Sequence, residues 1–126
     1  MYYNLLPQLK NALQARKDKI IVPFSRMDAS VANVLVEAGY LKSADIEMIA
    51  GKKALVIRLV RGDKKGSMND FKIVSKPSRH FYRDYRSLRP VKQGHGLALI
   101  STSRGIMSDK QARKDKVGGE YLFEIW

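Results

Sequence analysis

The final stretch of the chain, residues 97–126, reads LALISTSRGIMSDKQARKDKVGGEYLFEIW. It opens with an apolar run typical of a buried strand, and that run leads directly into the hydroxyl-rich loop Ser101–Gly105. A short helix is predicted from about Ser108 to Lys114, with Ser108 or Asp109 as its cap, and a last strand from Tyr121 to Trp126. This order predicts a small sheet that holds its polar loop at a strand end.

The residues before this stretch predict two further short strands, Phe71–Val74 and Arg79–Tyr82. They flank Ser75-Lys76-Pro77-Ser78, a tight connection whose proline fixes φ. Residues 85–93 have no regular pattern. The second half of the chain is therefore expected to be mostly β, with one short helix.

Two amphipathic helices are predicted in the first half. Apolar residues at helical spacing predict a helix from about Asn4 to Ala15, with Asn4 as its cap and Pro7 in the first turn, where a missing N–H costs nothing. A second helix begins after the cap Ser25 and ends at Gly39, a residue suited to a left-handed C-terminal cap.

Strands are predicted between and after these helices. The β-branched run Lys19–Val22 is closed by Pro23. Ile46–Ile49 and Ala54–Val60 flank Ala50–Lys52, which indicates a β-hairpin with a basic, exposed tip.

A polar segment with two glycines, Arg61–Ser67, marks a boundary between two lobes. We therefore predict an α/β (α+β) protein with two small lobes. Residues 1–66 form an N-terminal lobe in the order α-β-α-β-β, and residues 67–126 form a C-terminal, mostly β lobe.

The chain is strongly basic. It has 24 Lys and Arg against 12 Asp and Glu in 126 residues, a net charge of +12. Residues 1–63 contribute +4 and residues 64–126 contribute +8, and the segment Lys72–Lys92 alone holds seven basic residues against Asp84. Such a concentrated patch favours a polyanionic partner, of which nucleic acid is the commonest.

Composition excludes several classes of protein. With 44% apolar and 29% charged residues, the chain is a folded domain and not a disordered basic tail. It has no cysteine, which excludes disulfides, thiolate metal sites and a cysteine nucleophile. No apolar run is long enough to span a bilayer. Because the N-terminus lacks a targeting pattern, we expect an untargeted cytoplasmic protein.

The loop Ser101–Gly105 is well suited to an RNA surface. Its hydroxyls can donate to phosphates and 2′-OH groups and can also accept from base amino groups, whereas a purely basic patch cannot accept. Arg104 adds charge, and Gly105 lets a backbone come close. An ordinary Ser/Thr turn that satisfies its own backbone is an equal alternative from composition alone.

These same residues carry a family resemblance. Ser101–Lys110, Ala112-Arg113 and Val117–Glu120, followed by the terminal Trp126, resemble the C-terminal signature of the bacterial-type small-subunit ribosomal protein eight family. Lys10-Asn11-Ala12, Val22-Pro23, Gly39-Tyr40-Leu41 and Ser75-Lys76-Pro77 follow the family's order and spacing, so the resemblance covers nearly the whole chain.

The resemblance implies a two-lobed α/β protein of the small ribosomal subunit. Such a protein binds the central domain of small-subunit ribosomal RNA, supports subunit assembly and contacts the small-subunit ribosomal protein five family. The RNA-binding residues implied by motif position are Ser101, Thr102, Ser103, Arg104, Gly118, Gly119, Glu120, Lys76, Pro77 and Tyr82. Ser78 stands where the family commonly has Gly.

The residues themselves extend this set. Gly105 belongs to the loop, and Ser78, Arg79 and Arg83 belong to the earlier turn. We expect Lys76, Arg79, Arg83, Arg86, Arg89 and Arg104 to attract phosphates, and Gly118-Gly119 to approach RNA closely. Tyr82 or Tyr85 is expected to stack on a base unless it is buried. Glu120 is expected to hold Arg104 or a backbone amide.

Other functions have weaker support in the sequence. The catalytic candidates His80, His95, Asp84, Asp109 and Glu120 form no recognised spacing, so we expect neither an enzyme nor a cofactor or metal site. The sequence has no recognised DNA-binding motif, and its basic residues do not form the polar face of an amphipathic helix suited to a membrane surface. A translational repressor that binds its own messenger RNA and a general basic RNA-binding protein remain alternatives.

Overall fold

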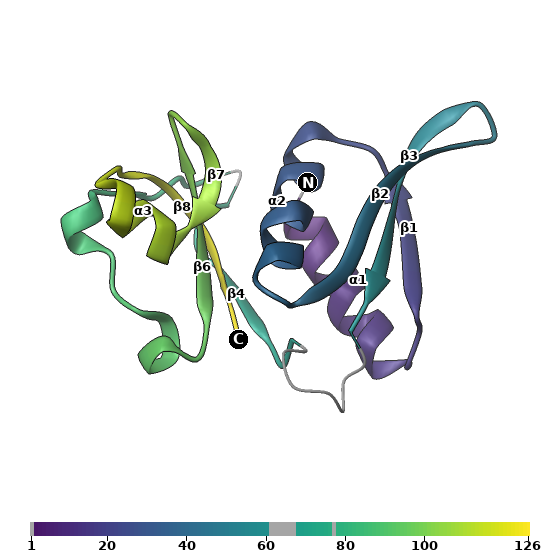
Figure 1. Cartoon of the computed structure of the whole chain (residues 1–126), viewed down its shortest axis with the longest axis horizontal. Coiled ribbons are helices and arrows are strands. Elements are labelled where there is room, and N and C mark those ends of the chain that lie inside the picture. Colours follow the sequence, from purple (N-terminus) through teal and green to yellow (C-terminus); the bar gives the residue numbers. More distant parts are fainter. Residues whose placement is uncertain (1, 61–67, 77) are drawn as a thin grey trace. The chain divides into compact units, whose positions relative to one another are not determined.

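Two units make up the chain, Met1–Asn69 and Asp70–Trp126. The computed structural model describes residues 2–60, 68–76 and 78–126 (Figure 1). The boundary predicted between residues 66 and 67 lies outside the described residues. Within these ranges no helix is long and apolar enough to cross a membrane. The mixed α/β class predicted from the sequence is confirmed.

Unit 1 places two helices against a three-stranded sheet. Its elements are α1 (Tyr2–Gln14), β1 (Lys19–Pro23), α2 (Arg26–Glu37), β2 (Leu41–Ile49) and β3 (Lys52–Leu59). The sheet is antiparallel in the order β1-β3-β2, and both helices lie on one of its faces (Figure 1). The predicted α-β-α-β-β order is confirmed.

The start of α1 differs from the prediction. The helix begins at Tyr2, so Asn4 is not its cap and Pro7 lies inside the helix. A proline there removes one backbone hydrogen bond. Tyr2 is 4% exposed and continues the buried stripe of Leu5 and Leu9, so apolar burial extends the helix by a turn despite the proline.

The second helix and the hairpin follow local rules. The Ser25 hydroxyl accepts a hydrogen bond from the Asp28 N–H at 3.0 Å, and Gly39 has φ +88°, as predicted. Ala50 and Gly51 both have positive φ (53° and 79°), which suits a two-residue turn between strands of natural twist. β2 begins at Leu41, earlier than predicted.

Unit 2 is built on a sheet in the order β4-β8-β6-β7, with β5 also paired to β8. Its strands are β4 (Phe71–Ile73), β5 (Tyr82–Arg83), β6 (Leu97–Thr102), β7 (Gly105–Ser108) and β8 (Gly119–Ile125). The 3₁₀ turns η1 (Tyr85–Ser87) and η2 (Val91–Gly94) and the helix α3 (Asp109–Asp115) complete it.

Three boundaries in unit 2 correct the prediction. The strand expected at Arg79–Tyr82 lies at Tyr82–Arg83, because Lys76 and Arg79 pair with each other across the connection. The predicted loop Ser101–Gly105 is shorter than expected, because β6 extends to Thr102 and residues 105–108, for which no strand was predicted, form β7 by pairing with β6. β8 begins at Gly119, two residues early.

One face of this sheet is covered by α3 and the segment 84–96. The buried cluster there consists of Leu88, Val91, Ala98, Ile100 and Ala112, with the side chains of Tyr85, Met107, Val117, Tyr121 and Trp126 packed around it. Ser108 caps α3 by accepting from the Gln111 N–H at 3.1 Å. Leu99 and Phe123 pair with each other, alternate along their strands with this cluster and are 0% exposed, so the opposite face is buried there as well.

Candidate nucleic-acid interface

The two predicted groups of site residues meet at one end of the unit 2 sheet. Tyr82 of β5 pairs with Glu120 of β8, and Glu120 pairs with Ser101 of β6. Directly opposed residues of neighbouring strands point to the same face, and strands lie about 4.8 Å apart. Tyr82, Glu120 and Ser101 therefore stand side by side, and we call them the polar row.

The hydroxyl loop is a tight turn between β6 and β7. The Thr102 hydroxyl donates to the Gly105 carbonyl at 2.8 Å and accepts from the Arg104 N–H at 3.1 Å. Gly105 has φ +109°, a conformation that favours glycine. The alternative of a Ser/Thr turn that satisfies its own backbone therefore applies to Thr102, whose hydroxyl bonds to the backbone of the turn. Ser103 and Arg104 are exposed at the tip of the turn.

The paired glycines Gly118 and Gly119 fit against their own chain. A Cβ on Gly119 would lie 2.1 Å from the Ser101 carbonyl oxygen, and one on Gly118 would lie 2.5 Å from that of Arg83. Both distances are far inside van der Waals contact. These glycines therefore let β8 pass closely between the backbones of β5 and β6.

The partner of Glu120 corrects the sequence expectation. Its Oε2 lies 2.7 Å from Nδ1 of His80, and not against Arg104. The pairing of Tyr82 with Glu120 brings the neighbouring His80 to this carboxylate. The sequence had no signal for this pair because the two residues are 40 positions apart. His80 is about half exposed and Glu120 largely buried, so the histidine lies on the solvent side.

A buried serine fixes the loop that carries Lys76 and Arg79. Ser75 is 0% exposed, its hydroxyl lies 2.7 Å from the Tyr121 carbonyl, and it accepts from the Phe81 N–H at 3.0 Å. Lys76 and Arg79 exchange backbone hydrogen bonds of 2.8 and 3.0 Å. Both ends of the loop are thereby fixed to the sheet, which orients its basic side chains.

The other predicted members of this loop have varied positions. Pro77 lies outside the described residues, and Ser78 is exposed. The Arg79 guanidinium lies over the Phe81 ring, 4.8 Å from its centroid. A stacked guanidinium is held flat and keeps its N–H donors available at the edge.

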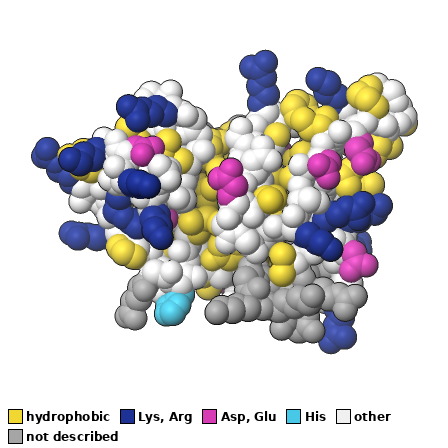
Figure 2. Space-filling view, viewed as in Figure 1, with side chains coloured by type: hydrophobic (Ala, Val, Ile, Leu, Met, Phe, Trp, Pro, Cys, Tyr) yellow, Lys and Arg dark blue, Asp and Glu magenta, His cyan; other side chains and the backbone are white. Residues whose placement is uncertain are grey.

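A basic hollow lies beside this loop. Its volume is about 570 Å³. Six basic residues line it, namely Lys72, Lys76, Arg79, Arg83, Arg89 and Lys92, and Glu124 is the acidic residue among its described lining. Figure 2 shows Lys and Arg side chains gathered over the unit that contains α3. The hollow concentrates positive charge, so it attracts phosphate groups.

The lining of the basic hollow also includes aromatic and apolar residues, among them Phe81, Val91 and Tyr121. Burial raises the pKa of the Tyr121 phenol, and the nearby carboxylates of Glu124 and Asp109 raise it further, so the phenol stays neutral. The Lys92 ammonium lies 4.5 Å from the Trp126 ring centroid. The hollow thus combines basic side chains with neutral aromatic and apolar ones.

The two tyrosines proposed for stacking have different environments. Tyr82 is 73% exposed. Tyr85 packs against the buried cluster, and its hydroxyl accepts from Arg86 Nε at 3.3 Å. Tyr82 is therefore the available stacking surface, next to Glu120.

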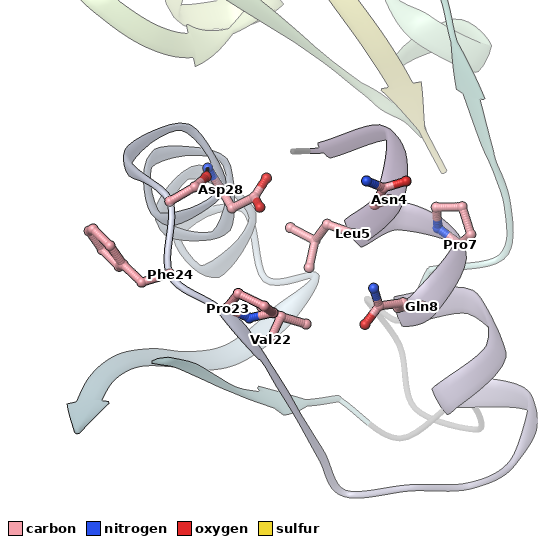
Figure 3. Close-up of a pocket in the computed structure, with 9 residues that line it drawn as sticks. Asn4, Leu5, Pro7, Gln8, Val22, Pro23, Phe24 and Asp28 are labelled. Carbon is pink, nitrogen blue, oxygen red and sulfur yellow. Dashed lines mark hydrogen bonds between the residues drawn. The ribbon is translucent and has the colours of Figure 1, made fainter. Parts of the chain in front are cut away.

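Unit 1 contains a contrasting hollow of about 420 Å³ (Figure 3). It lies between α1 and the connection from β1 to α2. Its lining is Asn4, Leu5, Pro7, Gln8, Val22, Pro23, Phe24, Ser25 and Asp28. Asp28 is the charged residue among these, so this hollow does not suit phosphate.

Most of the residues considered for catalysis have structural partners or lie apart. Asp109 is buried, accepts from the Ala98 N–H at 3.1 Å and pairs with Arg113 at 2.7 Å. His80 and Glu120 contact each other but converge with no third acid or base. In the part of the chain that the structure describes, no three His, Asp or Glu residues gather as metal ligands do.

Comparison with known proteins finds similarity over nearly the whole length. The family model described as "Ribosomal protein S8" matches residues 2–126. The small ribosomal subunit protein uS8 of Caldicellulosiruptor bescii is 41% identical over 126 residues, which cover 98% of this chain and 94% of the relative. The uS8 protein of Syntrophobacter fumaroxidans is 39% identical with the same coverage. That of Ureaplasma parvum serovar 3 is 37% identical, covering 97% and 94%.

Proposed function

Since this chain belongs to the ribosomal protein S8 family, we propose that it binds the central domain of small-subunit ribosomal RNA and supports the assembly of that subunit. As a member of this family it is a structural ribosomal protein and not an enzyme. Ribosomal RNA and other ribosomal proteins are its partners. The RNA-binding role is assigned to the C-terminal lobe, residues 67–126.

The observation that carries this proposal is that the polar row and the basic hollow share the edge strand β5. Arg83 lines the hollow, and the adjacent Tyr82, whose side chain points to the other face of the sheet, belongs to the row. RNA that passes around this edge can therefore place its backbone at the hollow and an irregular part at the row. In this arrangement the basic hollow attracts the RNA backbone, and the polar row recognises the irregular RNA structure.

The basic hollow supplies affinity without reading sequence. Each phosphate neutralised by a lysine or arginine releases a condensed counterion, so binding weakens as salt rises. Arg79 and Arg83 present planar guanidinium groups, which form paired hydrogen bonds with phosphate. The hollow thus steers and orients the RNA.

The polar row and the hydroxyl loop supply selectivity. Ser101 and the exposed Ser103 can donate to or accept from 2′-OH groups and base edges. Tyr82 offers an exposed ring on which an unpaired base stacks. Glu120, held by His80, accepts from a base amino group where the helix opens. These contacts require an irregular RNA structure.

We further propose that the protein works in the cytoplasm, within the small ribosomal subunit. The resemblance supports the small-subunit ribosomal protein five family as one neighbour. The alternative, a general basic RNA-binding protein, would use the basic hollow alone.

The test is a titration of the purified protein with a central-domain fragment of small-subunit ribosomal RNA and with a scrambled RNA of equal length. Each is measured at about 50 mM and about 200 mM salt. We expect the central-domain fragment to stay bound at the higher salt and the scrambled RNA to be released. Equal binding of both RNAs and equal loss with salt would overturn the proposal.

A further inference from the structure

The last five residues of strand β2, Asp45–Ile49, are all exposed. They belong to β2, which is an edge strand because the sheet order is β1-β3-β2. Ile46, Met48 and Ile49 are 56%, 65% and 40% exposed. Figure 2 shows hydrophobic side chains at the surface of the β2–β3 hairpin, which extends past the two helices of its unit (Figure 1). This apolar surface is solvent-exposed.

The two edges of this sheet are protected differently. β1 has Lys19 at its start and Pro23 at its end, and both residue types discourage the pairing of a further strand. From Ser43 to Ile49, β2 has neither lysine nor proline, and its one irregularity lies between Leu41 and Ser43. Half of the backbone N–H and C=O groups of an edge strand point outward. β2 therefore offers a regular edge for strand addition.

Side chains of two kinds alternate along this edge. Ile46 is directly opposite Leu55 and therefore lies on the helix-bearing face, as does Met48 two residues on. Asp45 and Glu47 point to the other face. An added strand would meet apolar groups on one face and carboxylates on the other.

The charge of this edge identifies its occupant. In a chain of net charge +12, the segment 43–49 has two acidic residues and no basic one. Its two carboxylates disfavour phosphate, and the basic residues beside them, Lys52, Lys53 and Arg58, belong to the neighbouring strand β3. A second copy of this chain that paired β2 with β2 would bring Asp45 and Glu47 near their own counterparts, and like charges across strands destabilise pairing. A lysine- or arginine-bearing segment complements the edge.

We propose that residues Ser43–Ile49 bind an extended basic segment of a neighbouring small-subunit protein, which adds a fourth strand to the unit 1 sheet. Main-chain hydrogen bonds to β2 hold this segment, apolar side chains cover Ile46 and Met48, and basic side chains face Asp45 and Glu47. The inference goes beyond RNA binding and depends on the chain's place in the small subunit.

The absence of cysteine permits a direct test. A benzophenone is attached to Ile46→Cys, or to the control Ile21→Cys on β1, which is 53% exposed. Purified small subunits that contain each labelled protein are irradiated, and the adducts are identified by mass spectrometry. We expect position 46 to give at least fivefold more protein adduct than position 21, at an extended basic segment. An adduct to RNA or to a second copy, or equal yields, would overturn the proposal.

A second measurement uses the unchanged protein. Hydrogen exchange of residues 43–49 is compared between free protein and assembled subunits, with residues 19–23 as the internal reference. We expect at least tenfold slower exchange at 43–49 on assembly and little change at 19–23. Unchanged exchange at 43–49 would overturn the proposal. Failure of the unchanged protein to enter subunits would instead count against the proposed function.

Charge reversal sharpens the identification of the partner. Asp45→Lys with Glu47→Lys is compared with Asp18→Lys with Glu37→Lys, a matched pair of exposed acids in the same unit. We expect the first pair to reduce the adduct from position 46 at least tenfold and the second to leave it unchanged. Equal effects of the two pairs would contradict a role for acidic side chains.

Discussion

Each unit contains a hairpin that closes with a two-residue turn, and the two hairpins expose different side chains. β2–β3 and β6–β7 each close with a two-residue turn, between Ile49 and Lys52 in one and between Thr102 and Gly105 in the other. The first turn depends on backbone geometry, with positive φ at Ala50 and Gly51. The second is held by the Thr102 hydroxyl.

The difference lies in what surrounds each turn. In the β2–β3 hairpin, residues 43–49 of β2 expose apolar and acidic side chains, which suit protein, and the tip exposes Lys52 and Lys53. The β6–β7 hairpin exposes Ser103 and Arg104 in the unit that carries the basic hollow, a combination that suits RNA. Hairpins closed by turns of equal length thus present different side chains, and we expect these side chains to select the partner.

The largest effect is expected from Gly119→Ala. Its Cβ would meet the Ser101 carbonyl at 2.1 Å, so β6 and β8 must separate. We expect a loss of about 3 kcal/mol in the free energy of unfolding, measured by denaturant titration. Gly51→Ala, which meets nothing within 4 Å but has positive φ, should cost about 1 kcal/mol. A larger loss for Gly51→Ala than for Gly119→Ala would show that the strands around Gly119 are packed otherwise than described.

The next effect concerns the basic hollow. Arg83→Ala should weaken the binding of all RNAs similarly. It should also reduce the slope of log affinity against log salt by about one, because one phosphate contact is lost. Arg58→Ala, an exposed arginine on the unit 1 sheet, is the control and should leave the slope unchanged. The measurement is RNA titration over a range of salt. Equal changes in salt slope for the two variants would mean that the net charge of the protein, and not the position of the arginine, determines RNA affinity.

A smaller effect should separate the two loop hydroxyls. Ser103→Ala should reduce discrimination between central-domain and scrambled RNA severalfold, with little change in the salt slope or the melting temperature, because Ser103 is exposed. Thr102→Ala should reduce discrimination and also destabilise the turn by about 1 kcal/mol, because its hydroxyl makes two hydrogen bonds. Paired RNA titrations and thermal melts test this. A salt slope that changes as in Arg83→Ala would contradict the division between recognition and attraction.

The smallest expected effect is a loss of folding stability at alkaline pH. Burial raises the pKa of Tyr121 above its unfolded value of about 10, and burial also raises the pKa of Tyr40 in unit 1. The folded state then binds these protons more tightly, so their stabilisation is complete below pH 10 and is lost as pH rises above it. Melting temperatures at pH 8 to 11 should fall less steeply for Tyr121→Phe. Since Glu124 and Asp109 add to the shift at Tyr121, Tyr40→Phe should flatten the curve less.

Local features of the fold could be predicted from sequence. The Ser25 cap, the Gly39 terminus and the hairpin turn depend on residues within four positions of one another. The errors came from burial and strand pairing. α1 begins early where Tyr2 is buried, and residues 105–108 become a strand by pairing with β6 across a tight turn.

The site was predictable in composition but not in arrangement. Its hydroxyls, glycines and basic residues were named from the sequence, yet only strand register places Tyr82, Glu120 and Ser101 side by side. The pairing of His80 with Glu120 follows from that register. The packing role of Gly119 likewise requires knowledge of which strand passes it.

The central claim is that the two hairpins face different partners, and directed cleavage of RNA tests it most directly. An iron chelate that generates hydroxyl radicals is attached to Ser103→Cys or to Ile46→Cys, each the sole cysteine in its protein. Each labelled protein is bound to the central-domain RNA fragment. We predict strong, localised cleavage from position 103 and at least tenfold less from position 46. Equal cleavage from both positions, or stronger cleavage from position 46, would contradict this account.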